Sequence, residues 1–99
     1  MPSQVIALAN VKLIYDGIPA DGALITVGDG VGSVYTCRAY GTAGQTVEIR
    51  GGFPDDAWAD MQQIAVLTVG ADQSAVTQHA WPVLAVQGAA RLKIARGSM

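Results

Sequence analysis

The chain has 99 residues, of which 51% are apolar and 14% are charged, and its formal net charge is −2. This is the length of one domain, and an acidic balance with six basic residues scattered from Lys12 to Arg96 excludes the electrostatic footprint of a nucleic-acid-binding protein. Soluble domains usually contain about 25% charged residues, so the shortage of charge indicates that part of the surface contacts protein rather than water.

The sequence also bears on cellular location. Residues 1–4 carry no basic stretch, and no apolar run approaches the ~20 residues that cross a bilayer as a helix. We therefore expect no signal peptide, no membrane partner and synthesis in the cytoplasm. Cys37 is the single cysteine, which excludes an intrachain disulfide, and a lone buried thiol usually packs as a small hydrophobic side chain.

The first predicted strand covers residues 4–10, continues through 11–15 and ends in a turn at 16–19, where Asp, Gly and Pro gather. Its apolar side chains Val5, Ile6 and Leu8 fall on both faces of the strand. In a free monomer at least one apolar face or an open strand edge would then meet water. We therefore predict that residues 1–10 form an arm or strand that contacts a neighbouring subunit through these three side chains.

The next predicted strands are residues 23–27 and 31–40, joined by a Gly-Asp-Gly hairpin turn at 28–30. In the second of these strands the side chains alternate between two faces. One face carries Tyr35, Cys37 and Ala39, and the other carries Val34, Thr36, Arg38 and Tyr40.

After a turn at residues 41–44, strand 46–50 alternates most clearly, with Val47 and Ile49 inward and Glu48 and Arg50 in water. The last strand shows the same pattern around Leu92 and Ile94. We expect these four apolar side chains to share one core with a Trp.

Three more strands are predicted at residues 66–69, 74–78 and 81–86. Pro82 has no N–H for a ladder, so the strand at 81–86 either lies on an edge or begins at the proline.

Residues 55–64 have two interpretations. Trp58, Met61 and Ile64 recur near helical spacing after an Asp that could cap a short helix, but the segment is short and runs into a β-rich stretch, which slightly favours an extended strand.

The pattern as a whole predicts a single all-β domain over residues 1–99. Short strands separated by Gly, Pro and Asp clusters are typical of a small antiparallel β-sandwich or barrel, here with about seven or eight strands and one optional short helix near 55–64.

Catalytic residues are not predicted. His79 is the single histidine, so no His pair is available for a metal. Asp72 and Ser74 are too close to it along one short hairpin to converge as a triad, and no nucleophile turn is present. A dyad of His79 with Cys37 is disfavoured because Cys37 lies within a predicted strand, where a thiol is usually buried and unactivated.

Three other groups of residues are candidate ligand sites. Asp55, Asp56 and Asp60 could bind a cation, but they do not follow a calcium-loop pattern, and a solvated turn is favoured. The glycines at 28–32 precede a strand rather than a helix, so a hairpin is favoured over a phosphate loop. The aromatic residues could form a stacking platform for sugars or bases, although at least one Trp is expected in the core. These residues are Tyr15, Tyr35, Tyr40, Phe53, Trp58 and Trp81. We therefore predict no metal, no cofactor and no catalytic residue.

The order of elements from residue 44 to residue 94 resembles that of small β-sandwich proteins of tailed-bacteriophage particles. The matching stretches are TVEIRG at 46–51, WADM at 58–61, Gly70, WPVLAV at 81–86 and GAARLKI at 88–94. The Asp-Gly usual before the Trp is replaced by Asp55-Asp56-Ala57, and residues 1–40 carry no such resemblance.

The resemblance implies a structural virion protein, made in the host cytoplasm and located in the virion, with capsid decoration (cement) on the outer shell ahead of a tail or connector role. Its implied partners are other virion proteins, above all the major capsid protein, in a homo-oligomer or multicopy assembly, with no nucleic acid. Two alternatives from other classes are a carbohydrate-binding or ligand-binding module using aromatics near Phe53, Trp58 or Trp81, and a small enzyme dependent on His79.

Overall fold

A computed structural model describes residues 11–27, 33–78 and 80–97. Within these ranges the chain is all-β, with eight strands and one 3-10 turn. The elements are β1 Val11–Gly17, β2 Ala23–Thr26, β3 Val34–Tyr40, β4 Thr46–Gly52, η2 Trp58–Asp60, β5 Gln62–Thr68, β6 Ser74–Gln78, β7 Val83–Gly88 and β8 Arg91–Gly97. The predicted fold class is confirmed. The predicted strand at 4–10, with Val5, Ile6 and Leu8, and the turn at 28–30 lie outside the described residues.

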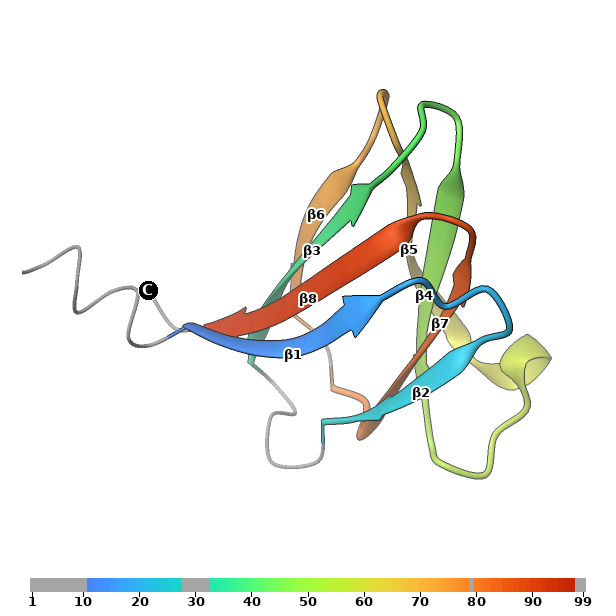
Figure 1. Ribbon diagram of the computed structural model, residues 1–99. Coiled ribbons are helices and arrows are strands. Elements are labelled where there is room, and N and C mark those ends of the chain that lie inside the picture. The colour runs from blue at the N-terminus through green and yellow to red at the C-terminus, as the bar shows by residue number, and fades with distance from the viewer. Residues whose placement is uncertain (1–10, 28–32, 79, 98–99) are drawn as a thin grey trace, which may run out of the picture.

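The strands form two four-stranded antiparallel sheets (Figure 1), which we call sheet A, in the order β1-β8-β3-β6, and sheet B, in the order β2-β7-β4-β5. Among the described strands, β4 and β5 are the single pair of sequence neighbours that also pair in a sheet. Every other connection between consecutive described strands crosses from one sheet to the other, so strands that pair within a sheet are distant in sequence. The fold is thus a sandwich whose ladders are mostly long-range.

The core lies between the two sheets and follows from strand alternation. Val47, Ile49, Leu92 and Ile94 are each at most 1% exposed, which confirms their predicted inward facing. The predicted tryptophan plug is wrong, because Trp58 and Trp81 are only half-buried. The largest fully buried side chain is Tyr35 of β3, one of the three residues predicted on the inner face of that strand.

Several strand ends and one strand position differ from the sequence predictions. β1 extends through Gly17, and the turn comes later, where Gly22 donates from its N–H to the Pro19 carbonyl at 3.0 Å with a φ of +88°. β7 begins directly after Pro82, as one of the two predicted alternatives had it. Its edge placement is wrong, because β7 lies between β2 and β4; the proline is simply outside the ladder.

The segment between β4 and β5 corrects the extended interpretation of residues 55–64. Phe53 and Asp56 close a tight turn, since the Phe53 N–H donates to the Asp56 carboxylate at 3.0 Å and the Asp56 N–H donates to the Phe53 carbonyl at 3.0 Å. One turn of 3-10 helix at Trp58–Asp60 follows, and β5 starts only at Gln62. Asp56 therefore caps the preceding turn, while the helical N-cap residue is Ala57, with no side-chain cap.

Candidate partner-binding surfaces

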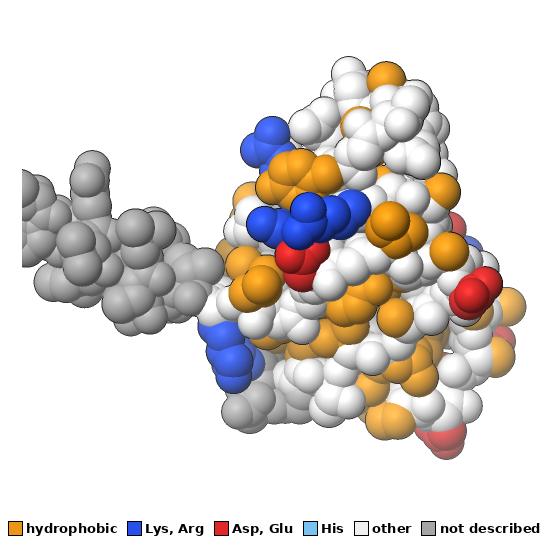
Figure 2. All heavy atoms as spheres, in the orientation of Figure 1, with side chains coloured by type: hydrophobic (Ala, Val, Ile, Leu, Met, Phe, Trp, Pro, Cys, Tyr) orange, Lys and Arg blue, Asp and Glu red, His pale blue; other side chains and the backbone are white. Residues whose placement is uncertain are grey.

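The outer face of sheet A carries a cluster of cations around an aromatic ring. The side chains of Arg38 and Lys93 lie 5.5 Å and 5.8 Å from the centre of the Tyr40 ring, and Arg91 is the register partner of Tyr40 on β8. We call Arg38, Tyr40, Arg91 and Lys93 the basic face. Figure 2 shows basic side chains gathered around hydrophobic ones over β3 and β8. Cations over an aromatic ring are held there by the ring quadrupole.

One carboxylate is built into this face. Asp16 of β1 accepts two hydrogen bonds from Arg91, from Nε at 2.8 Å and from Nη2 at 2.8 Å. These bonds hold the pKa of Asp16 below its ordinary value, with smaller contributions from the charges of Arg91 and Lys93. The pair ties the edge strand β1 to β8 and neutralises one of the three cations.

An apolar row crosses the same face beside the cations. Leu13, Ala95, Thr36 and Val76 are successive register partners on β1, β8, β3 and β6. The two ends of the row are open to solvent, because Leu13 is 56% exposed and Val76 is 71% exposed. The neighbouring row runs Asp16, Lys93, Arg38 and Ser74. An apolar row spanning a sheet and flanked by charges is typical of a protein-contact surface.

The outer face of sheet B is partly covered by the segment 53–61. Arg50 anchors this cover, since it donates to the Trp58 carbonyl at 2.7 Å, lies 4.5 Å from the centre of the Trp58 ring and pairs with Glu48 at 2.6 Å. The prediction that Glu48 and Arg50 lie in water is therefore wrong; their side chains are 26% and 21% exposed. The alternation was right and the solvent assumption was not, because another segment packs on the outer face.

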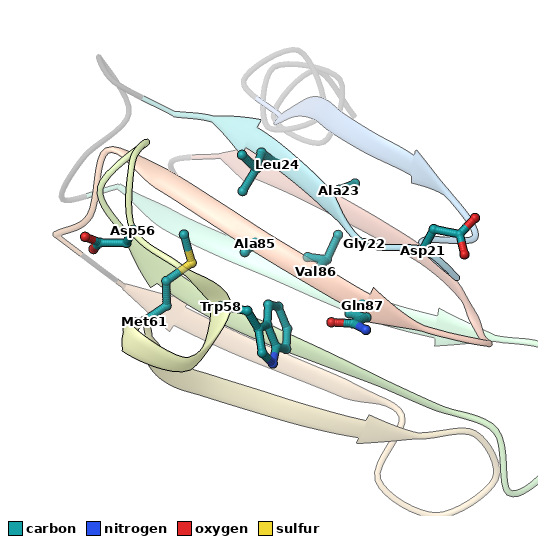
Figure 3. A pocket seen from close by; sticks show the side chains of 10 residues that line it. All are labelled: Asp21, Gly22, Ala23, Leu24, Asp56, Trp58, Met61, Ala85, Val86 and Gln87. Atoms are coloured by element: carbon teal, nitrogen blue, oxygen red, sulfur yellow. The ribbon is translucent and has the colours of Figure 1, made fainter.

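A groove opens between this cover and strands β2 and β7. Its volume is about 270 Å³. Trp58, Met61 and Leu24 form its apolar walls, and Figure 3 shows Asp56 and Asp21 at its two ends. The remaining lining residues are Gly22, Ala23, Ala85, Val86 and Gln87. We call this the acidic groove. Among the residues that the structure describes, no basic side chain lines it.

A second cleft lies beside β5 and β6. It has a volume of about 390 Å³ and is lined by Gln62, Gln63, Ile64, Thr77, Gln78, Ala80 and Trp81. Phe53 packs edge-on against the Trp81 ring with 5.6 Å between ring centres. Of the aromatic residues considered for a platform, these two are thus joined, whereas Trp58 belongs to the acidic groove and Tyr40 to the basic face.

The residues weighed for chemistry are dispersed. Cys37 is 1% exposed, as predicted for a packing thiol, and desolvation by burial raises its pKa to about 11. His79, the glycines at 28–32 and the predicted contact residues Val5, Ile6 and Leu8 lie outside the described residues. Within the described part of the chain, no three His, Cys, Asp or Glu side chains come close enough to hold a metal ion.

No protein-family model matches the chain, and no curated protein is significantly similar to it in sequence. The residues described by the structure also include no helix of the length and hydrophobicity needed to cross a bilayer.

The sequence analysis missed the basic face and the acidic groove, because each is assembled from strands that are neighbours in space only. Arg91 and Asp16 are 75 positions apart.

Proposed function

We propose that the protein is a multicopy structural protein of a tailed-bacteriophage particle, and specifically a capsid decoration protein that binds the outer shell. Its partners in this proposal are the major capsid protein and neighbouring copies of itself. The sequence resemblance over residues 44–94 supports the assignment to a tailed-bacteriophage particle. The observation that carries the proposal is the exposed apolar row from Leu13 to Val76, which lies beside the cations of the basic face.

The physical argument rests on how that face would behave in water. Removing its apolar side chains from water favours association in proportion to the area covered. The adjacent cations speed and orient the encounter more than they add affinity. A rigid four-stranded surface also loses little conformational entropy on docking. The proposal assigns no catalysis: the buried Cys37 thiol serves packing, and its raised pKa keeps it protonated.

The experiment measures copies of the protein per particle by quantitative mass spectrometry. The double variant Leu13→Asp/Val76→Asp, with both changes at exposed positions, should lower the copy number strongly while the isolated domain stays folded. Val66→Asp is the matched control, since Val66 is 41% exposed on the opposite sheet. A wild-type copy number in the double variant would refute the proposal.

The same measurement separates the shell from the tail. Hundreds of copies per particle would indicate the shell, whereas a few to dozens would indicate a tail or connector component. Deleting residues 1–9, the segment predicted to contact a neighbouring subunit, should reduce incorporation more than it lowers the melting temperature of the isolated domain.

A second candidate, a carbohydrate-binding module, is favoured by the cleft at Trp81. Three glutamines, a threonine and Trp81 line this cleft, and amide, hydroxyl and aromatic groups suit the hydroxyls and the flat apolar face of a sugar ring. A glycan array with the wild-type domain tests this candidate. Binding that is lost in Gln63→Ala, at an exposed position beside the tryptophan, would favour it over the decoration role.

A further inference from the structure

Folding separates the charges that are scattered along the sequence. All six basic residues of the chain are described, and five of them lie in sheet A, where Asp16 is the single described carboxylate, so the formal charge of that sheet is +4. The five are Lys12, Arg38, Arg91, Lys93 and Arg96. Sheet B and the described turns that flank its strands carry six carboxylates and Arg50, so their formal charge is −5. The six are Asp21, Glu48, Asp55, Asp56, Asp60 and Asp72. The small net charge of the chain is therefore the sum of two large and opposite formal charges, one on each side of the sandwich.

The acidic groove has the chemistry of a receptor for a cationic side chain. Lysine and arginine combine an apolar stem with a charged head. Here the walls of Trp58 and Met61 suit the stem. Asp21 and Asp56 lie at the two ends with their carboxylates directed outward (Figure 3), and their charges favour a cationic head at the mouth of the groove. At about 270 Å³ the groove is below the ~300–1,000 Å³ of sites for drug-sized ligands. Its size therefore fits one or two side chains rather than a cofactor.

The basic face supplies side chains of that kind. Arg91 is engaged by Asp16, whereas Arg38 and Lys93 lie over the Tyr40 ring at the surface of the sheet. We infer that the basic face of one copy of this protein docks against the acidic groove of the next copy, with Arg38 and Lys93 entering between Asp21 and Asp56. This inference rests on the proposed multicopy role and identifies one of its partners as a second copy of the chain.

The placement of the two surfaces fixes the kind of contact. They lie on the outer faces of opposite sheets of one sandwich, so they cannot meet in a single isologous pair. A contact between two different surfaces is heterologous and repeats from copy to copy, which produces a ring or an open row.

The first test is sedimentation velocity of the purified full chain at two ionic strengths. The Debye length is about 30 Å at about 10 mM salt and about 3 Å at about 1 M salt. We expect concentration-dependent association at low salt and its loss at high salt. A wild-type chain that stays monomeric at low salt would overturn the inference.

The second test uses two variants that each lose one surface. Asp21→Lys/Asp56→Asn removes the charge of the acidic groove, and Asn at position 56 keeps an oxygen to accept the Phe53 N–H. Arg38→Glu/Lys93→Glu reverses the basic face. Each variant alone should be monomeric, and their equimolar mixture should form a 1:1 heterodimer that grows no further, because one intact basic face and one intact groove remain. Association of either variant alone, or a mixture that stays monomeric, would overturn the inference.

Controls and outcomes separate this inference from the proposed function. Asp72→Lys and Lys12→Glu change charge outside the two surfaces and should leave association intact, and circular dichroism checks that every variant folds. A chain that is monomeric, yet needs Leu13 and Val76 to enter particles, would overturn the inference alone. A chain that forms the mixed heterodimer but never enters particles would overturn the proposed function alone.

Discussion

Asp16 and Arg91 meet across the β1–β8 ladder as a two-point ion pair, with N–O distances of 2.8 Å and 2.8 Å, although 75 positions separate them in the sequence. The pair lies at the surface, where solvent weakens ion pairs. Its geometry still matters for register, because among the described strands β1 is an edge strand that pairs with β8 alone. Two parallel hydrogen bonds to a planar guanidinium fix one alignment of the two strands.

The first prediction concerns the pH dependence of this pair. The pKa of Asp16 is lowered from 3.8 in the folded protein, so its contribution to stability is complete well above pH 3.8 and is lost as the pH falls through the lower folded pKa. Asp16→Asn should therefore lower the melting temperature at neutral pH, and the difference from wild type should shrink in acid. Thermal melts of both proteins across pH measure it, with Asp72→Asn as the exposed control. A difference independent of pH would contradict the assignment.

The second prediction concerns the shared core of the two sheets. Ile49 and Leu92 are 1% and 0% exposed, so truncation of either to alanine should cost about 2–5 kcal/mol through lost burial and an unfilled cavity. Val66→Ala, at a 41% exposed position of β5, should cost within about 0.5 kcal/mol. Urea denaturation measures all three. Equal losses at buried and exposed positions would show that these residues do not share a core.

The alternation of apolar and polar residues predicted which side chains of the strands are buried, because one apolar face per strand shows that Val47, Ile49, Leu92 and Ile94 point inward. The alternation could not predict which segment covers the opposite face. Arg50 was expected in water because nothing in its own strand reveals that Trp58 packs over it. Strand patterns describe one strand at a time, whereas covers and grooves arise between segments.

The charge clusters were unpredictable for the same reason. Arg38 and Lys93 are 55 positions apart in the sequence, yet they are direct register partners in sheet A. No local sequence pattern indicates that β3 pairs with β8. The sequence distribution of basic residues was therefore read as scattered. The misplaced tryptophan has a different cause: size favoured Trp as the core plug, but the largest fully buried side chain is Tyr35, and both tryptophans are only half-buried.

The third prediction concerns the buried thiol. Desolvation raises the pKa of Cys37 from 9.0 to about 11. Between these values the unfolded chain has lost the thiol proton while the folded chain keeps it, so folding stability falls as the pH rises through this window. Relative to Cys37→Ala, the wild type should lose on the order of 2 kcal/mol between pH 9.0 and about 11. Denaturation curves across this range measure the loss, and a constant difference between the two proteins would contradict it.

Below pH 9.0, the Cys37 thiol of the folded protein should also react far more slowly with a disulfide reagent than the thiol of the unfolded chain does.

The fourth prediction concerns the close approach of Trp81 to β4. A Cβ added at Gly51 would collide with Trp81 Cδ1 and lie 2.8 Å from its Cγ and 3.0 Å from Ile64 Cδ1. Because the Cγ belongs to the base of the indole rather than to a flexible tip, the ring must move as a whole. Gly51→Ala should therefore cost about 1–3 kcal/mol, as overpacking usually does, and should shift the tryptophan fluorescence.

Gly17→Ala is its matched control, since the nearest atom to a Cβ there is the Tyr15 hydroxyl at 3.3 Å, and its effect should be small. The double variant Gly51→Ala/Trp81→Leu should lose less stability than the two single changes predict together, because the smaller side chain leaves room for the methyl group. Strictly additive losses in this cycle would show that Gly51 is required for a reason other than the tryptophan packed against it.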